Sequence, residues 1–258
     1  MSFLRRVYRL VDARLDQSIL GSVWQYGKWR FTYAFRRNNR VPAFEDLIRQ
    51  PHRGALVDTV VNMRGVGSLL EVGCGRAANL YLLSRAMPGL LLRGVDISST
   101  AIAQGSAELK ARGVTGVHLE LGSSEALTAF ESHSMDLVVA DAVTMYIPPQ
   151  RISQALSELL RVARLGIVLG AWHCEVSDGC EPYRYDEGAW VYDYRRLLAP
   201  YAGLTLSIVR YPDGAWSNER WKRYGALLIA RHETPQQAEQ GERTGGLQDR
   251  SASPGSGT

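Results

Sequence analysis

The sequence predicts an α/β protein in which helices cover both faces of a mostly parallel sheet. From residue 68 to residue 172, short apolar segments alternate with segments of helical character. The apolar segments are continuous, which is typical of strands buried on both faces of a parallel sheet. The last two apolar segments follow each other without a predicted helix between them, and this pair predicts an antiparallel hairpin at the sheet edge.

Each element of this alternation can be placed in the sequence. Strands are predicted at residues 68–72, 90–96, 116–121, 135–141 and 166–172, and helices at 43–50, 52–63, 76–87, 100–112 and 150–164. Pro88 and Gly89 end one of these helices, and Ser98 or Ser99 can cap another. A further helix is expected at 188–201, before the closing strands at 204–211 and 224–231, which a short loop joins.

Composition and length fit an enzyme-sized globular protein. Of the 258 residues, 45% are apolar, which allows a sizeable core. No stretch approaches the ~20 apolar residues needed to span a bilayer, and the first residues do not resemble a secretory signal. The three cysteines include no CxxC pair, so neither a zinc site nor a disulfide framework is expected. We therefore expect a reduced, cytoplasmic protein without a bound metal.

Three regions of different composition divide the chain. Residues 1–54 are basic and aromatic and are predicted to form a helical lid or cap, residues 55–232 hold the α/β domain, and residues 233–258 are predicted to form a disordered tail. The first 40 residues carry nine Lys or Arg side chains against two aspartates. This charge favours an anionic small molecule or peripheral contact with an anionic membrane. Nucleic acid is not expected, because no separate recognition module is visible.

A glycine turn follows the first predicted strand, in "SLLEVGCGRAANL". Gly73 and Gly75 allow a sharp turn and let a ligand approach the backbone without meeting a Cβ atom. The helix that follows offers free N–H groups and a partial positive charge, which favour a carboxylate or another anionic group. An ordinary strand–helix turn is the alternative interpretation of the two glycines.

Two carboxylates restrict the ligand that this turn can bind. Asp96 ends the second predicted strand, 25 residues after Glu71, where a carboxylate can accept hydrogen bonds from both ribose hydroxyls of a nucleoside. The stretch from Gly73 to Ala78 also matches the dinucleotide fingerprint, so an NAD-linked oxidoreductase is one interpretation. Glu71 disfavours a pyrophosphate and favours a cation, and the chain after the fifth strand is too short for a second βαβαβ half.

Four segments together resemble the motifs of the class I S-adenosylmethionine-dependent methyltransferases of the bacterial small-molecule type. They are "LLEVGCGRAANL", "GVDIS", "LELGSSEAL" and "DLVVADAVTMYIPP", within roughly residues 55–232. The resemblance implies a three-layer, doubly wound α/β fold with a seven-stranded sheet whose last strand is antiparallel. It also implies S-adenosylmethionine as the cofactor and S-adenosylhomocysteine as the product.

The resemblance also assigns the first two motifs to parts of this cofactor. Gly73 and Gly75 are implied to line the methionine portion, with Glu71 and Cys74 in the same turn. Asp96 is implied to hold the ribose. Many members of the family have a third glycine where this chain has Ala77, and a methyl group at that position is expected to be tolerated.

The remaining motifs are implied to contact the adenine and the sulfonium. Ile97 is implied to pack on the adenine, and Asp141 and Ala142 to lie under the sulfonium. The residues implied to flank the adenine edge are Ser123, Ser124 and Glu125. Many members have an acidic residue at position 123, where a serine hydroxyl can accept the same hydrogen bond more weakly.

Transfer of a methyl group to oxygen needs a positioned acceptor and a group that takes its proton. His173, directly after the fifth strand, is the candidate general base, and a locally hydrogen-bonded loop histidine is the alternative. The other four histidines are expected at surface or strand positions without a role: His52, His118, His133 and His232. The residues expected to wall the acceptor pocket are Tyr26, Trp29, Arg30, Tyr146, Trp172, Tyr183, Tyr185 and Trp190.

The sequence thus predicts a methyltransferase that acts on a small molecule, with an oxygen of a sugar, a lipid-linked compound or a secondary metabolite as the preferred acceptor. Two alternatives stay open. One is the NAD-linked oxidoreductase, and the other is a non-catalytic partner protein that keeps the fold and the cofactor site. The intact glycine turn and Asp96 argue against loss of the binding site but do not establish turnover.

Overall fold

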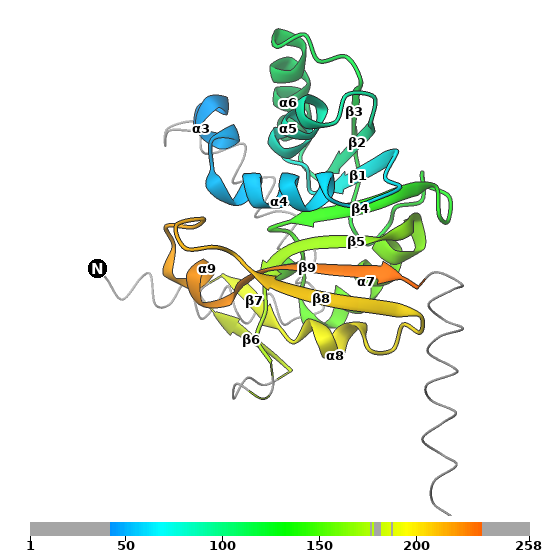
Figure 1. Ribbon diagram of the computed structural model, residues 1–258, viewed down its shortest axis with the longest axis vertical. Helices are drawn as coiled ribbons and strands as arrows, with labels where there is room; N and C mark the ends of the chain where they lie inside the picture. The colour runs from blue at the N-terminus through cyan, green and yellow to red at the C-terminus, as the bar shows by residue number, and fades with distance from the viewer. Residues whose placement is uncertain (1–41, 176, 178–181, 187, 234–258) are drawn as a thin grey trace, which may run out of the picture.

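A computed structural model describes residues 42–175, 177, 182–186 and 188–233. Within them, a seven-stranded sheet runs in the order β3-β2-β1-β4-β5-β9-β8 (Figure 1). Its strands are β1 (Ser68–Val72), β2 (Leu91–Asp96), β3 (Val117–Leu121), β4 (Met135–Asp141), β5 (Ala163–Trp172), β8 (Leu204–Arg210) and β9 (Gly225–His232). Strands β1 to β5 pair in parallel, and β9 lies antiparallel between β5 and β8. The predicted fold class is confirmed.

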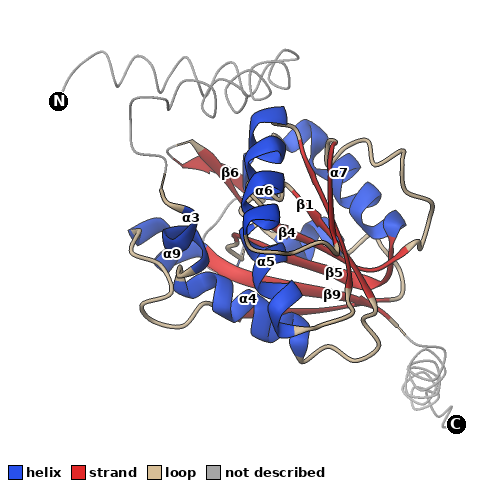
Figure 2. Cartoon of the chain, turned by 90° about the horizontal axis from the view of Figure 1, so that it is seen from above, coloured by secondary structure: helices blue, strands red, loops and turns tan. Residues whose placement is uncertain are grey.

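Helices cover both faces of this sheet (Figure 2). On one face pack α4 (Pro51–Val61), α5 (Ala78–Ala86) and α6 (Ser99–Ala111), whose leucines share a buried cluster with Leu69 of β1. On the other face pack α7 (Pro149–Val162) and α8 (Tyr194–Leu198), which share a second buried cluster with Leu70 of β1. Neighbouring residues of one strand therefore serve opposite faces, as the continuous apolar segments predicted.

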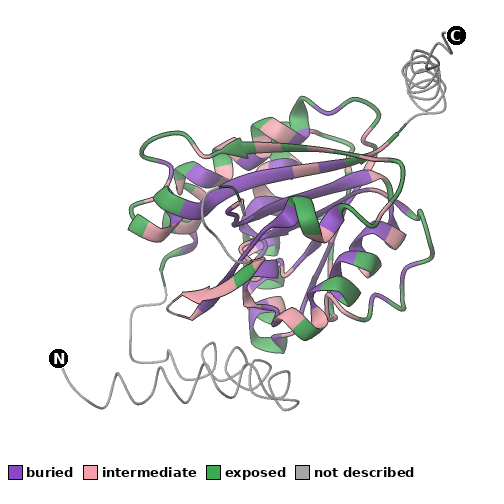
Figure 3. Ribbon diagram, turned by 90° about the horizontal axis from the view of Figure 1, so that it is seen from below, coloured by how far each residue is buried: buried purple, intermediate pink, exposed green. Residues whose placement is uncertain are grey.

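Burial falls from the centre of the sheet to its edges (Figure 3). Strands β1 and β4 are buried over almost their whole length, whereas β8 has only intermediate and exposed residues. The central strands place their carboxyl ends beside one another. Glu71 and Asp141, near or at the ends of two neighbouring strands, are accordingly buried side chains that face one site.

The segment expected to be a helix at 188–201 differs from that prediction. Only α8 is helical, and the residues before it form β7 (Ala189–Tyr192), paired antiparallel with β6 (Tyr183–Asp186) in a separate two-stranded sheet. Trp190 and Tyr192 belong to the main core, while Val191 between them belongs to another buried cluster. This alternation of faces is that of a strand, and the aromatic and β-branched side chains favour it.

The connection between β8 and β9 was expected to be a loop but contains the short helix α9 (Glu219–Tyr224). The side chain of Asn218 caps it by accepting a hydrogen bond from the N–H of Arg220. Trp221 is buried on its inner side and stacks on Trp216, which precedes the helix. The helix thereby fixes the position of Trp216.

The first described residues are attached to the domain through α3 (Phe44–Ile48) and α4, which confirm the two helices expected at 43–50 and 52–63. Phe44 is buried against Tyr81 of α5, and the guanidinium of Arg112 lies 4.4 Å from the centre of its ring. Arg112 also pairs with Glu45. Residue 54, where the sequence placed the end of the lid, falls inside α4.

The cysteines and the helices bear on the expected compartment. Cys74 is a buried free thiol, whereas Cys174 is disulfide-bonded, which corrects the expectation of reduced cysteines. An odd number of cysteines without a paired motif gives no sequence signal for a single bridge. Among the described residues, no helix combines the length and the apolar character that a membrane span requires.

Gly166 in β5 is expected to tolerate no side chain. Its φ is 148°, and a Cβ atom there would overlap the carbonyl oxygen of Ala230 in β9. We expect Gly166→Ala to lower the free energy of unfolding by roughly 2–4 kcal/mol in urea denaturation. The control is Gly54→Ala in α4, where a Cβ meets nothing within 4 Å and alanine should stabilise the helix by ~1 kcal/mol. Equal stabilities of the two variants would contradict this account of β5.

Candidate active site

A cavity of about 330 Å³ opens at the carboxyl ends of β1, β2, β3 and β4. Residues of α3, α4, α7 and the β8–β9 connection also line it. In open α/β sheets, ligands bind at this edge. Its lining includes every residue that the sequence assigned to the cofactor: Glu71, Gly73, Cys74, Gly75, Asp96, Ile97, Ser123, Ser124, Glu125, Asp141 and Ala142.

The turn between β1 and α5 is built from left-handed residues. Gly73 and Gly75 have φ angles of 74° and 52°, and Ala77, at the position of the third glycine, has a φ of 63°. The N–H groups of Gly73 and Cys74 donate to the carbonyl oxygen of Val95, at 2.7 and 3.0 Å, and tie the turn to β2. Within the described residues, the first N–H groups of α5 have no side-chain cap, so they can bind an anionic group.

Asp96 is held in a fixed orientation beside this turn. Its Oδ2 accepts a hydrogen bond from the N–H of Gly75, and its Oδ1 accepts one from the N–H of Ser98, both at 2.8 Å. Each carboxylate oxygen keeps a further lone pair that can accept from a ribose hydroxyl. Burial raises the pKa of Asp96, and the two backbone hydrogen bonds oppose that effect.

Asn79 joins two buried carboxylates on the floor of the cavity. Its Nδ2 donates to Oε1 of Glu71 at 2.7 Å and to Oδ2 of Asp141 at 3.1 Å, and its Oδ1 accepts from Nη1 of Arg53 at 2.7 Å. The same Nη1 lies 3.7 Å from Oδ2 of Asp141. Oε2 of Glu71 and Oδ1 of Asp141 have no hydrogen-bond partner among the described residues. The floor therefore has spare acceptors and an excess of acidic groups.

Burial dominates the ionisation of these acidic groups. It raises the pKa of Glu71 to about 8, while the hydrogen bond from Asn79 and the charge of Arg53 act in the opposite direction. Burial also raises the pKa of Asp141. At neutral pH and without a cation in the cavity, Glu71 holds a proton. A cationic ligand would favour its ionised form.

His52 corrects the expectation of a surface or strand position. It is 3% exposed, lies in α4 and lines the cavity. Its ring stacks on Trp216 with centroids 3.6 Å apart, and Trp216 stacks on Trp221 at 3.9 Å. Nε2 of His52 lies 3.9 Å from Oδ2 of Asp141. Burial, followed by the charge of Arg53, lowers the pKa of His52 to about 3, so its imidazole is neutral at pH 7.

The loop after β3 forms the opposite end of the cavity. Ser123 forms an isolated β-bridge with Ala126, and its hydroxyl accepts a 3.4 Å hydrogen bond from the N–H of Glu125. The carboxylate of Glu125 pairs with Arg151 of α7. An adenine bound at this end of the cavity would therefore contact hydroxyl groups and the ion pair between Glu125 and Arg151.

The residues expected to wall an acceptor pocket are only partly brought to the cavity. Tyr146 lines it. Trp172 is buried in a cluster with Trp221, and Trp190 is buried in the main core, against which Tyr185 packs. Tyr183 is 47% exposed on β6. None of these last four lines the cavity, and Tyr26, Trp29 and Arg30 lie outside the described residues.

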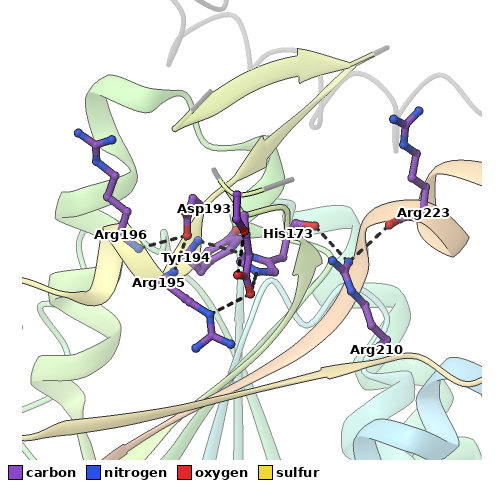
Figure 4. A network of polar contacts seen from close by, with 9 residues as sticks. His173, Asp193, Tyr194, Arg195, Arg196, Arg210 and Arg223 are labelled. Atoms are coloured by element: carbon purple, nitrogen blue, oxygen red, sulfur yellow. Dashed lines mark hydrogen bonds and ion pairs between the residues drawn. The ribbon is translucent and has the colours of Figure 1, made fainter. Parts of the chain in front are cut away.

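His173 lies outside the cavity, in the polar network that Figure 4 shows. It is 1% exposed, and its Nδ1 accepts a 3.4 Å hydrogen bond from the N–H of Tyr194. Its carbonyl oxygen accepts from Nη1 of Arg210 at 3.1 Å, and its Nε2 lies 3.7 Å from Oε1 of Glu175. Burial, with the charge of Arg210, lowers the pKa of His173. These contacts are those of a locally hydrogen-bonded histidine that joins β5 to α8.

His173→Ala is accordingly expected to weaken the fold and to leave ligand binding intact. Loss of the ring and of its contact with Tyr194 should lower the free energy of unfolding by roughly 1–3 kcal/mol. Urea denaturation and calorimetry with S-adenosylmethionine measure the two properties, and His118→Ala, at an exposed position of β3, is the control. Unchanged stability together with lost turnover would restore His173 as a candidate base.

The cavity lining also includes residues that the sequence did not assign to the site, among them His52, Arg53, Asn79 and Trp216. Asn79 could have been noticed as a polar residue in the Ala- and Leu-rich segment "RAANLYLL". No local signal places His52 and Arg53 there, because their position depends on how α4 packs on the sheet. Among the described residues, no group of three or more His, Cys, Asp or Glu side chains is arranged to hold a metal ion.

Comparison with known proteins agrees with this geometry. The family described as a methyltransferase domain matches residues 69–166, from β1 into β5. An uncharacterized protein of Haemophilus influenzae is 28% identical over 97 residues. That match covers 37% of this chain and 38% of the relative, so the chain matches well under half of the relative's length.

Solved structures share the fold at low sequence identity. One is magnesium protoporphyrin IX methyltransferase from Synechocystis PCC 6803 with bound SAM, at 17% identity and a TM-score of 0.55, covering 81% of this chain and 97% of that one. Another is geranyl diphosphate C-methyltransferase from Streptomyces coelicolor A3(2), in complex with Mg²⁺, geranyl-S-thiolodiphosphate and S-adenosyl-L-homocysteine, at 17% identity and a TM-score of 0.53, covering 70% and 76%.

The strand order, the left-handed turn after β1 and the carboxylate at the end of β2 define a Rossmann-like fold, which the solved structures share. Residues 69–166 match a methyltransferase domain, in agreement with the four motifs that resemble the class I S-adenosylmethionine-dependent methyltransferases.

Proposed function

We propose that the protein moves a methyl group from S-adenosylmethionine to an oxygen atom of a small molecule: a sugar, a lipid-linked compound or a secondary metabolite. The observation that supports S-adenosylmethionine as the donor is the arrangement of side chains around the turn of Gly73 and Gly75. Asp96 offers acceptors for a ribose on one side, and Glu71 and Asp141 offer negative charge on the other. This order suits a nucleoside with a positive charge and disfavours the pyrophosphate of NAD.

The residues around the turn offer groups that match the chemistry of this cofactor. S-adenosylmethionine supplies a methyl group on a positively charged sulfur, so the donor arrives activated. Asp96 would accept from the ribose hydroxyls, the uncapped N–H groups of α5 would bind the carboxylate, and Glu71 and Asp141 would stabilise the positive charge. Fixing donor and acceptor relative to each other can lower the barrier by on the order of 7–11 kcal/mol.

The acceptor side of the cavity is the part lined by Tyr146, His52 and Trp216. His52, in place of His173, is the histidine that could meet an acceptor hydroxyl, because it lines the cavity and its neutral imidazole can accept a hydrogen bond. The named neighbours are methyltransferases of geranyl diphosphate and magnesium protoporphyrin IX, which supports a small organic molecule as the acceptor.

The lid proposed for residues 1–54 gains support from its described end. α3, α4 and the two-residue connection between them contribute Leu47, Gln50, His52 and Arg53 to the cavity wall. Peripheral contact of the basic N-terminal stretch with an anionic membrane, and a cytoplasmic location, stay part of the proposal. Sedimentation with vesicles that contain anionic lipid, compared with neutral vesicles, tests the membrane contact.

Incubation with methyl-labelled S-adenosylmethionine and fractionated metabolite extracts tests transfer. We expect label in a small hydroxyl-bearing compound that chromatography and mass spectrometry can identify. Asp96→Ala, which removes the proposed ribose acceptor, should abolish the labelling. A protein that binds the donor but labels no fraction would instead be the non-catalytic partner, and label on carbon or nitrogen would contradict the oxygen acceptor.

A further inference from the structure

The buried network under the cavity connects four secondary-structure elements through one amide. Asn79 is in α5, Glu71 is in β1, Asp141 ends β4 and Arg53 is in α4. Asn79 is 1% exposed, and it makes hydrogen bonds to all three of the other side chains. Arg53 fixes the amide orientation, because a guanidinium only donates and must therefore face Oδ1 of Asn79.

The net charge of this network complements the charge of S-adenosylmethionine but not that of S-adenosylhomocysteine. With both carboxyl groups ionised, Glu71 and Asp141 contribute two negative charges and Arg53 one positive charge, so the network carries a single net negative charge. His52, the other ionisable side chain beside Asp141, is neutral. S-adenosylmethionine carries an ammonium, a sulfonium and a carboxylate, which sum to one positive charge, whereas S-adenosylhomocysteine has no net charge.

We infer that Asn79 is a positioning residue that, with Arg53, holds the carboxylates of Glu71 and Asp141 as one network, and that this network makes the site prefer the cationic donor to its neutral product. The inference rests on the proposed function, since it concerns the same cavity. Two carboxylates that share one donor group stay close together without direct contact, and each keeps one oxygen without a hydrogen-bond partner in the described part of the chain. Without Asn79, their separation and the position of Arg53 would no longer be fixed.

Asn79→Leu tests this inference, because leucine fills a similar volume and removes all three hydrogen bonds. The matched control is Asn62→Leu, at the exposed end of the same α4 that carries Arg53, where the amide donates to the carbonyl oxygen of Asp58. Calorimetry with S-adenosylmethionine, S-adenosylhomocysteine and 5′-methylthioadenosine gives three affinities for each protein. The third ligand has the nucleoside but neither the sulfonium nor the amino-acid part.

We expect the wild type to bind S-adenosylmethionine more tightly than S-adenosylhomocysteine. Asn79→Leu should weaken S-adenosylmethionine roughly 10-fold or more, weaken S-adenosylhomocysteine less, and leave 5′-methylthioadenosine unchanged. Asn62→Leu should change none of the three. A merely structural role of Asn79 would lower all three affinities together, and that result would overturn the inference, as would an unchanged preference for the donor.

A second variant keeps the test decisive if Asn79→Leu does not fold. Glu71→Gln keeps the acceptor for Asn79 and removes one charge, so the preference for S-adenosylmethionine over S-adenosylhomocysteine should fall towards equality. An unchanged preference in this variant also overturns the inference. If the wild type binds none of the three ligands, the proposed function itself fails, so the two failures are distinguishable.

Discussion

Gly73→Ala is expected to reduce the affinity for S-adenosylmethionine by roughly 100-fold, because it combines backbone strain with a collision inside the site. Gly73 has a φ of 74°, and a Cβ atom there would overlap Cγ2 of Val143. Val143 lines the cavity and follows directly on Asp141 and Ala142. Relief of the overlap requires a new rotamer of Val143 or movement of the turn after β1 or of the turn after β4, and both turns line the proposed donor site.

Gly89→Ala separates strain from collision in this experiment. Gly89 has a φ of 92°, and a Cβ there meets nothing within 4 Å. It follows α5 and does not line the cavity. We expect the free energy of unfolding to fall by about 1–2 kcal/mol and the affinity to stay at the wild-type value. If calorimetry finds wild-type affinity for Gly73→Ala as well, the cofactor does not depend on this turn.

The affinity for S-adenosylmethionine is expected to rise with pH up to about pH 8, the value to which burial raises the pKa of Glu71. Below that pH, Glu71 holds a proton that a bound cation must displace, so binding releases a proton and weakens as the pH falls. The affinity then falls by a factor that approaches ten for each pH unit below this pKa. His52, with a pKa of about 3, stays neutral through this window.

Calorimetry in buffers of different ionisation enthalpy measures the released protons directly. S-adenosylhomocysteine shares the ammonium and carboxylate of the donor but lacks the sulfonium, so its pH dependence should be shallower. Glu71→Gln should remove the rising limb for both ligands. A rising limb that persists in this variant would assign the titration to another group.

Glu71→Gln, which is expected to weaken binding of the donor, is also expected to stabilise the folded protein. In the unfolded chain Glu71 ionises near its ordinary pKa of 4.5, whereas the folded protein keeps it protonated up to about pH 8. The wild type therefore loses stability as the pH rises from about 4.5 to about 8. Glu71→Gln avoids this loss and should be more stable at pH 8 by a few kcal/mol in urea denaturation, on the order expected from the two pKa values. Glu71 thus lowers the stability of the folded protein but raises its affinity for the donor, which is consistent with a role in ligand binding.

The parts of the site that the sequence could predict are those that depend on one motif at a time. Gly73, Gly75 and Asp96 take part in turns whose geometry follows from a strand, a short connection and a helix. The buried strands could be placed because the central ones are apolar throughout. The cap of α6 at Ser98, one of the two serines considered, also follows local rules.

The remaining parts depend on how distant segments pack. Asn79 acquires its role from three partners that lie up to 62 residues away along the chain. His52 faces the cavity because α4 packs beside α5 and because Trp216, held by Trp221, covers its ring. His173 follows β5 directly, as expected for a site residue, and Trp190 lies within β7, but both side chains are buried among other elements. The spacing of residues along the chain does not distinguish side chains that face the cavity from side chains that are buried elsewhere.

Calorimetric titration of the wild type with S-adenosylmethionine and with NAD shows whether the cavity binds a sulfonium nucleoside. We expect a single molecule of S-adenosylmethionine to bind per chain, Asp96→Ala to abolish this binding, and NAD neither to bind nor to displace S-adenosylmethionine. Binding of NAD in place of S-adenosylmethionine, or binding of S-adenosylmethionine that Asp96→Ala leaves intact, would contradict this expectation.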